Sequence, residues 1–117
     1  MSLSQFQTRI KTLFGDKDAR RGVEGTFMWF MEEVGELSAA LRQGMRREGA
    51  PGVEDGLLSP AQKRKHELAL EFADVLAWLA TLANIAEVDL DAAIEAKYGR
   101  GCPKCVQTPC VCVEAKP

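Results

Sequence analysis

The sequence predicts an all-α fold whose core is completed by self-association and which ends in a short Cys-rich tail. Apolar residues recur at spacings of three and four, these stretches are bounded by residues that typically cap helices, and strand signals are poor. At 117 residues the chain is long enough for one domain and too short for two of ordinary size. We expect the helical domain to span residues 1–100 and the tail residues 101–117.

Two helices are expected before residue 45. The first has a buried face of Leu3, Phe6, Ile10, Leu13 and Phe14, with Ser2 as its cap and Gly15 as its stop. The charged segment Asp16–Gly25 contains two glycines and is interpreted as a connecting loop. The second helix has an apolar stripe that ends at Gly44 and consists of Phe27, Phe30, Val34, Leu37 and Leu41. Residues 46–58 contain four glycines or prolines, which predict a long loop.

The third helix has the clearest start in the chain. Ser59 is placed to cap it, Pro60 suits its first position, and Gln62 completes a capping box. From Leu68 to Ala86 this helix is apolar on nearly every side, so most of its surface must be buried. One short chain can hardly cover it alone, which predicts self-association. A short fourth helix begins at Asp89 or Asp91 and ends at Gly99.

Composition narrows the class of protein. With 46% hydrophobic residues, 27% charged residues and a net charge of −2, the chain resembles a soluble protein and lacks the basic excess of a nucleic-acid binder. No signal segment is expected at the N-terminus. The longest apolar run, near residues 75–82, is shorter than the roughly 20 residues of a membrane span. We therefore expect a cytoplasmic protein with no membrane and no nucleic-acid polymer as partner.

Two acidic residues interrupt the apolar third helix. Glu71 and Asp74 are the only charged residues between Leu68 and Ala86, and a spacing of three places them on one helix face. Two like charges on a buried helix are costly unless they share a cation. Because neither has a Lys or Arg within one turn of this helix, the cation has to come from elsewhere.

The second helix carries a matching acidic pattern. Glu33 and Glu36 are also three residues apart, and Glu32 precedes them. Two antiparallel helices that face each other along these stripes would bring four carboxylates together. Oxygen ligands without His or Cys suit Mg²⁺, with Mn²⁺ as a substitute. Either motif alone is more often a solvated surface, so the prediction of a metal site depends on the pair.

These residues resemble a known family. The segment FMWFMEEVGEL at residues 27–37, followed by EFADVL at residues 71–76, is similar to the EExxE…ExxD signature of MazG-like nucleotide pyrophosphohydrolases, over residues 1 to 100. The resemblance implies an all-α, four-helix-bundle-type core completed by dimerisation, as a homodimer or a dimer-of-dimers tetramer. It also implies Mg²⁺-dependent conversion of an NTP or dNTP to the NMP and pyrophosphate, for example in nucleotide-pool house-cleaning.

The resemblance also implies roles for individual residues. The metal ligands would be Glu33, Glu36, Glu71 and Asp74. Glu32 would be a supporting ligand or a catalytic base, a role that Glu33 could share. Substrate contacts would come from Lys97 and Arg100. Trp29 and Trp78 each lie one turn from a pair of acids, a position that suits stacking on the substrate base and equally suits core aromatics. The gap between the two acidic motifs is longer than is usual in the family. The likeness to the family is therefore weaker in the loop at residues 46–58 than at the ligands.

The tail offers a second metal site. Its four cysteines, Cys102, Cys105, Cys110 and Cys112, supply the number of thiolates that a structural Zn²⁺ needs, and free thiols or disulfides are the alternatives. Arg20 and Arg21 are candidate triphosphate contacts. Two other functions stay open: a phosphoribosyl-ATP pyrophosphohydrolase of the same superfamily, and a non-catalytic helical dimer whose zinc tail binds a partner.

Overall fold

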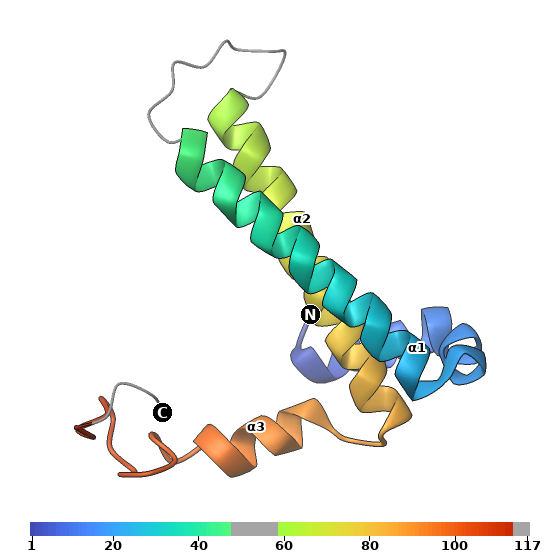
Figure 1. The fold of residues 1–117 in the computed structure, drawn as a ribbon. Helices are drawn as coiled ribbons and strands as arrows, with labels where there is room; N and C mark the ends of the chain where they lie inside the picture. Colours follow the sequence, from blue (N-terminus) through green and yellow to red (C-terminus); the bar gives the residue numbers. More distant parts are fainter. Residues whose placement is uncertain (48–58, 114–117) are drawn as a thin grey trace.

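The computed structural model describes residues 1–47 and 59–113, and within these ranges it is helical without strands (Figure 1). Helix α1 spans Leu3–Arg47, α2 spans Pro60–Ile85 and α3 spans Leu90–Tyr98. The predicted all-α class and the Cys-rich tail are confirmed.

Helix α1 corrects the expectation of two helices joined by a loop. Residues 16–25 are helical except at Gly22, where φ is 79° and ψ is −179° and the helix axis turns sharply (Figure 1). A positive φ suits glycine because it has no Cβ. The Thr26 hydroxyl donates to the Gly22 carbonyl oxygen at 2.7 Å, which satisfies a backbone group at the bend. The predicted stop at Gly15 is wrong, since helix continues through it.

The other boundaries of α1 also differ from expectation. The helix continues past Gly44 to Arg47. The loop predicted at residues 46–58 therefore loses its first two residues to α1, and its remaining residues lie outside the described part of the chain.

The bend divides α1 into two limbs, residues 3–21 and residues 23–47. The second limb runs antiparallel to α2, while the first limb lies across the C-terminal half of α2 (Figure 1). The Asn84 side-chain amide donates to the Gln7 carbonyl oxygen at 3.1 Å, which joins the first limb to α2. Ile10, Ala80 and Ala83 are the buried apolar residues of the described core, and they lie where this limb meets α2.

The predicted caps of α2 and α3 are confirmed. The Ser59 hydroxyl accepts from the Gln62 amide at 3.2 Å, and the Gln62 side chain accepts from the Ser59 amide at 2.8 Å. Asp89 caps α3 by accepting from the Ala92 amide at 3.1 Å, and Gly99 ends it. These side chains satisfy amide groups that a helix leaves without partners at its first turn.

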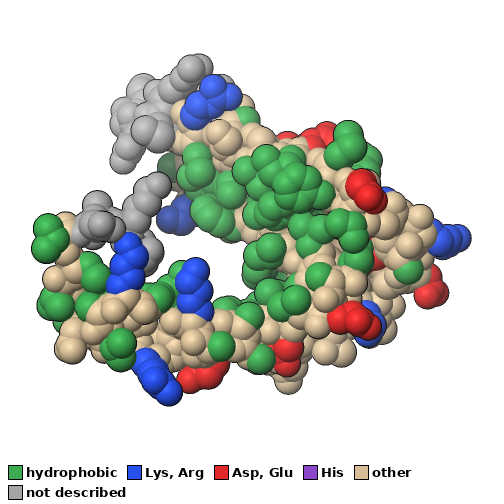
Figure 2. All heavy atoms as spheres, turned by 60° about the horizontal axis from the view of Figure 1, so that its bottom comes forward, with side chains coloured by type: hydrophobic (Ala, Val, Ile, Leu, Met, Phe, Trp, Pro, Cys, Tyr) green, Lys and Arg blue, Asp and Glu red, His purple; other side chains and the backbone are tan. Residues whose placement is uncertain are grey.

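Much of the apolar surface stays exposed in the single chain. Figure 2 shows a broad patch of hydrophobic side chains on one face of the molecule. On α1 and α2, the large apolar residues that are at least 40% exposed include Phe27, Met28, Leu70, Phe72, Leu76 and Leu79. A monomer rarely exposes so much contiguous apolar surface without a partner to cover it. Self-association nevertheless stays a prediction.

Helix α2 is long and apolar enough to cross a membrane by length and composition alone, with 17% of its most apolar window buried. The apolar part of α2 is therefore longer than the run near residues 75–82 indicated. The core helix of a soluble protein passes the same test, so length and composition do not by themselves assign a membrane span. The expectation of a protein without a membrane partner stays a prediction.

Candidate metal centre

The antiparallel pairing of α1 and α2 brings acids from both helices together. Glu33, Glu36 and Glu71 each offer a carboxylate oxygen, and these oxygens lie within 4.8 Å of one another. Asp74 lies outside that tight group, although its charge acts on both Glu33 and Glu71. We call these four residues the acid cluster. The structure thus confirms that the two acidic stripes face each other.

Burial and the charges of neighbouring carboxylates oppose ionisation of Glu33 and Glu71. Desolvation is the largest cause of the raised pKa of Glu33, followed by the charges of Glu36, Asp74 and Glu71. For Glu71 too, desolvation is the largest cause of the raised pKa, and the charges of Glu36 and Asp74 are smaller causes. Both effects are those expected where carboxylates gather without a neutralising cation.

Two oxygens of the acid cluster have no partner. The Oε2 atoms of Glu33 and Glu71 are buried and make no hydrogen bond. Within residues 1–47 and 59–113, the ion pair that the structure shows is Arg21 with Asp18, and it does not include the acid cluster. Buried carboxylate oxygens are normally paired, hydrogen-bonded or bound to a cation. An all-carboxylate donor set with unpartnered oxygens fits a hard divalent cation such as Mg²⁺ or Mn²⁺.

The two tryptophans lie beside the acid cluster and contact each other. The rings of Trp29 and Trp78 are stacked, with centroids 6.1 Å apart and planes inclined by 12°. The Arg21 guanidinium lies 4.8 Å from the centroid of the Trp78 ring. The Trp78 ring thus contacts two protein groups, and stacking of either tryptophan on a substrate base stays a prediction.

A buried polar group that the sequence reasoning missed lies next to these rings. Asp18 is only 4% exposed, although it falls in the segment expected to be a loop. Its carboxylate accepts from Arg21 Nη1 at 3.0 Å and from the Thr81 hydroxyl at 3.2 Å. The same guanidinium nitrogen donates to the Thr26 hydroxyl at 3.2 Å. Arg21, predicted as a triphosphate contact, thus holds the bend together, whereas Arg20 is exposed and donates to the Asp16 carbonyl oxygen.

A cavity of about 350 Å³ adjoins both features. It lies between the first limb of α1 and α2, and its lining includes Lys17, Asp18, Arg21, Asp74, Trp78 and Thr81. Its volume falls at the small end of the range typical of ligand sites. The cavity therefore combines an aromatic wall with cationic side chains and one edge of the acid cluster.

Comparison with known families agrees with this arrangement. Residues 21–107, more than half of the chain, match the family described as MazG nucleotide pyrophosphohydrolase domain. The chain belongs to this family. The predicted resemblance is confirmed, and membership supports nucleotide pyrophosphohydrolase activity at the level of the family, whose members are typically metal-dependent. A comparison with curated proteins found no match.

The MazG match covers both acidic motifs and extends past residue 100 to include Cys102 and Cys105. The division into domains at residue 100 stays a prediction. Glu32 is exposed and outside the tight carboxylate group of this MazG domain. The roles assigned to Glu32 and to the members of the acid cluster likewise stay predictions.

Lys97 and Arg100 are not brought to the acid cluster by this chain. Both are exposed, and they lie at the end of α3 and just beyond it, and α3 projects away from the α1–α2 pair (Figure 1). The Lys97 ammonium lies 5.4 Å from the centroid of the Tyr98 ring. Any contact of these residues with a substrate phosphate stays a prediction.

Proposed function

We propose that the protein is a Mg²⁺-dependent nucleoside triphosphate pyrophosphohydrolase, which converts an NTP or dNTP to the NMP and pyrophosphate. One observation carries the proposal: Glu33 and Glu71 each bury an unpartnered oxygen inside an all-carboxylate group, in a chain of the MazG family. Such a group is unfavourable by itself and is relieved by a divalent cation.

Glu33, Glu36 and Glu71 would hold the metal, and Asp74 would complete the set. When bound, Mg²⁺ neutralises phosphate charge and lowers the pKa of a bound water. Mn²⁺, which accepts the same oxygen ligands, would substitute for it.

Glu32 and Glu33 are the proposed catalytic residues. Glu32 is exposed and adjacent in sequence to Glu33, so its carboxylate is free to orient or deprotonate the attacking water. Glu33 would share this role as a carboxylate that is only partly engaged by the metal. The water attacks the α-phosphorus, and pyrophosphate is the leaving group.

The cavity beside Asp74 is the proposed nucleoside site. Trp78 and Lys17 line it, so the cavity offers an aromatic ring and a positive charge near Asp74. A nucleoside placed here would direct its phosphates toward the acid cluster. Because α3 points away from this site, Lys97 and Arg100 would contact the phosphates of a substrate that is bound by a partner copy.

Self-association forms part of the proposal. The exposed apolar side chains of α1 and α2, among them Phe72 at 53% exposure, would be covered by a second copy, in a homodimer or a dimer of dimers. This assembly would complete a four-helix-bundle-type core. We place the protein in the cytoplasm, without a membrane or nucleic-acid polymer as partner.

Pyrophosphate release from a panel of NTPs and dNTPs tests the activity. We expect Mg²⁺-dependent release by the full-length protein, abolished in Glu71→Gln and unchanged in Glu24→Gln, which alters an exposed acid outside the cluster. Including phosphoribosyl-ATP in the panel tests the alternative that the protein is a phosphoribosyl-ATP pyrophosphohydrolase. Full Mg²⁺-dependent hydrolysis by Glu71→Gln would overturn the proposed site. A tight dimer that neither binds Mn²⁺ nor releases pyrophosphate would favour a binding module instead.

A further inference from the structure

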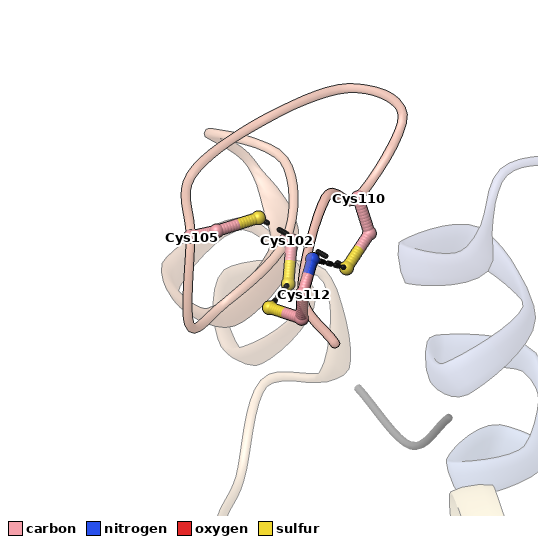
Figure 3. A group of neighbouring side chains, drawn as sticks. All are labelled: Cys102, Cys105, Cys110 and Cys112. Atoms are coloured by element: carbon pink, nitrogen blue, oxygen red, sulfur yellow. Dashed lines mark hydrogen bonds between the residues drawn. The ribbon is translucent and has the colours of Figure 1, made fainter. Parts of the chain in front are cut away.

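The segment after α3 folds around its four cysteines. Cys102, Cys105, Cys110 and Cys112 point toward one another, and their sulfur atoms all lie within 4.8 Å of one another (Figure 3). Only a few backbone hydrogen bonds support the segment, including Val106 N to the Cys102 carbonyl oxygen at 2.8 Å. Small irregular segments of this kind usually need a cross-link or a metal to hold one conformation.

The sulfur separations distinguish between a cross-link and a metal. Cys102 Sγ lies 3.8 Å from Cys112 Sγ, and Cys105 Sγ lies 3.9 Å from Cys110 Sγ. A disulfide would require about 2.05 Å. In a tetrahedral zinc site with Zn–S bonds of about 2.3 Å, neighbouring sulfurs are about 3.8 Å apart. The two measured separations therefore match the edges of a zinc–thiolate tetrahedron.

Backbone amides are directed at the sulfurs. The amides of Cys105 and Lys104 donate to the Cys102 sulfur, and those of Val111 and Gln107 donate to the Cys105 sulfur. The Cys112 amide donates to Cys110 Sγ at 3.3 Å. Amides directed at sulfur are typical of the tight turns that surround metal-bound cysteines.

Four sulfur atoms this close together would repel one another as thiolates. A divalent cation at their centre would replace the thiol protons and remove this repulsion.

We infer that Cys102, Cys105, Cys110 and Cys112 form a structural Zn²⁺ site. Four thiolates fill a tetrahedral coordination sphere and leave no open position, which is the pattern of structural sites and not of catalytic ones. The soft sulfur set also separates this site chemically from the hard oxygen set of the acid cluster. The inference is independent of the proposed hydrolase activity, since no residue is shared between the two sites.

Zinc analysis of the full-length protein, purified under reducing conditions, tests the inference. We expect about one zinc per chain in the wild type and a large loss in Cys110→Ser/Cys112→Ser. Glu71→Gln is the matched control and should keep its zinc, because it alters only the carboxylate site. Replacement by Co²⁺ should give the intense visible absorption and the sulfur-to-metal charge transfer of tetrahedral thiolate coordination.

The wild-type protein alone is sufficient to overturn the inference, whether or not the variant folds. Reduced protein that is supplied with zinc, contains almost none, and presents four reactive thiols would refute it. Iron bound in place of zinc would also refute the assignment. Circular dichroism of the variant separates loss of the metal from loss of the helices.

Discussion

Glu33→Gln should stabilise the metal-free protein and remove its response to divalent cations. Glutamine keeps the size of the side chain but carries no charge. The substitution therefore removes one of the carboxylates that lie within 4.8 Å of one another. Relative to the wild type, it should raise the free energy of unfolding without metal and lower it with metal. A residue that served only to pack α1 against α2 would not show this reversal.

The structure sets the scale of the effect. Two unit charges 4.8 Å apart repel by about 3 kcal/mol at an effective dielectric constant of about 20. Glu36 is exposed, so solvent screening reduces the net gain on removing the Glu33 charge to about 1 kcal/mol. For a domain of this size that gain corresponds to a rise in Tm of about 4 °C. In contrast, Mn²⁺ at about 100 times its Kd should stabilise the wild type by about 2.7 kcal/mol.

The pH dependence of the same experiment has a defined sign. Because the pKa of Glu33 is raised above its ordinary 4.5, the folded protein holds this proton more tightly than the unfolded chain. The stability associated with Glu33 is therefore fully present below pH 4.5 and is lost as the pH rises through its folded pKa. We expect Glu33→Gln to match the wild type in acid and to exceed it increasingly toward neutral pH.

Thermal unfolding at fixed protein concentration, in EDTA and across a Mn²⁺ titration, measures both effects. Glu24→Gln is the control, since it removes an exposed charge from the same helix and should leave the Mn²⁺ response intact. If Glu33→Gln lowered the Tm in EDTA, or if Mn²⁺ still raised its Tm by as much as that of the wild type, the reasoning about the acid cluster would be wrong.

Three further predictions concern the scaffold. Thr81→Val should lower the free energy of unfolding by about 1–3 kcal/mol in urea titrations, because it removes a hydrogen bond to the buried Asp18, whereas Thr12→Val at an exposed site should change it by less than about 0.5 kcal/mol. Ser59→Ala should cost about 1 kcal/mol by the same measurement, and no loss would show that the capping box contributes little. Phe72→Asp should dissociate the proposed oligomer in light scattering, and an unchanged mass would place the interface elsewhere.

The sequence predicted the features that depend on local chemistry. The start of α2 follows from Ser59, Pro60 and Gln62, whose positions relative to one another determine their hydrogen bonds. The acid cluster was foreseen because Glu71 and Asp74 lie in a helix too apolar to carry unneutralised charge without a reason. Both predictions required only a helical period and the cost of burying a polar group.

The bend in α1 could not be foreseen in the same way. Glycines and charged residues in 16–25 are typical of a loop, but whether helix resumes at once depends on contacts far away in the sequence. Asp18 is buried because Thr81 and Arg21 complete its hydrogen bonds, and Thr81 is 63 residues distant. The i,i+3 spacing of Asp18 and Arg21 was a local signal of helix in this segment.

The family match begins at residue 21, one residue before the bend at Gly22. Four residues that line the cavity beside Asp74 come from the limb that precedes this match, namely Ile10, Phe14, Lys17 and Asp18. Mutations in that limb would change the shape and charge of the cavity and leave every carboxylate of the acid cluster in place. In the proposed nucleoside site, selectivity would therefore depend partly on residues outside the matched segment, whereas the proposed metal ligands all lie within it.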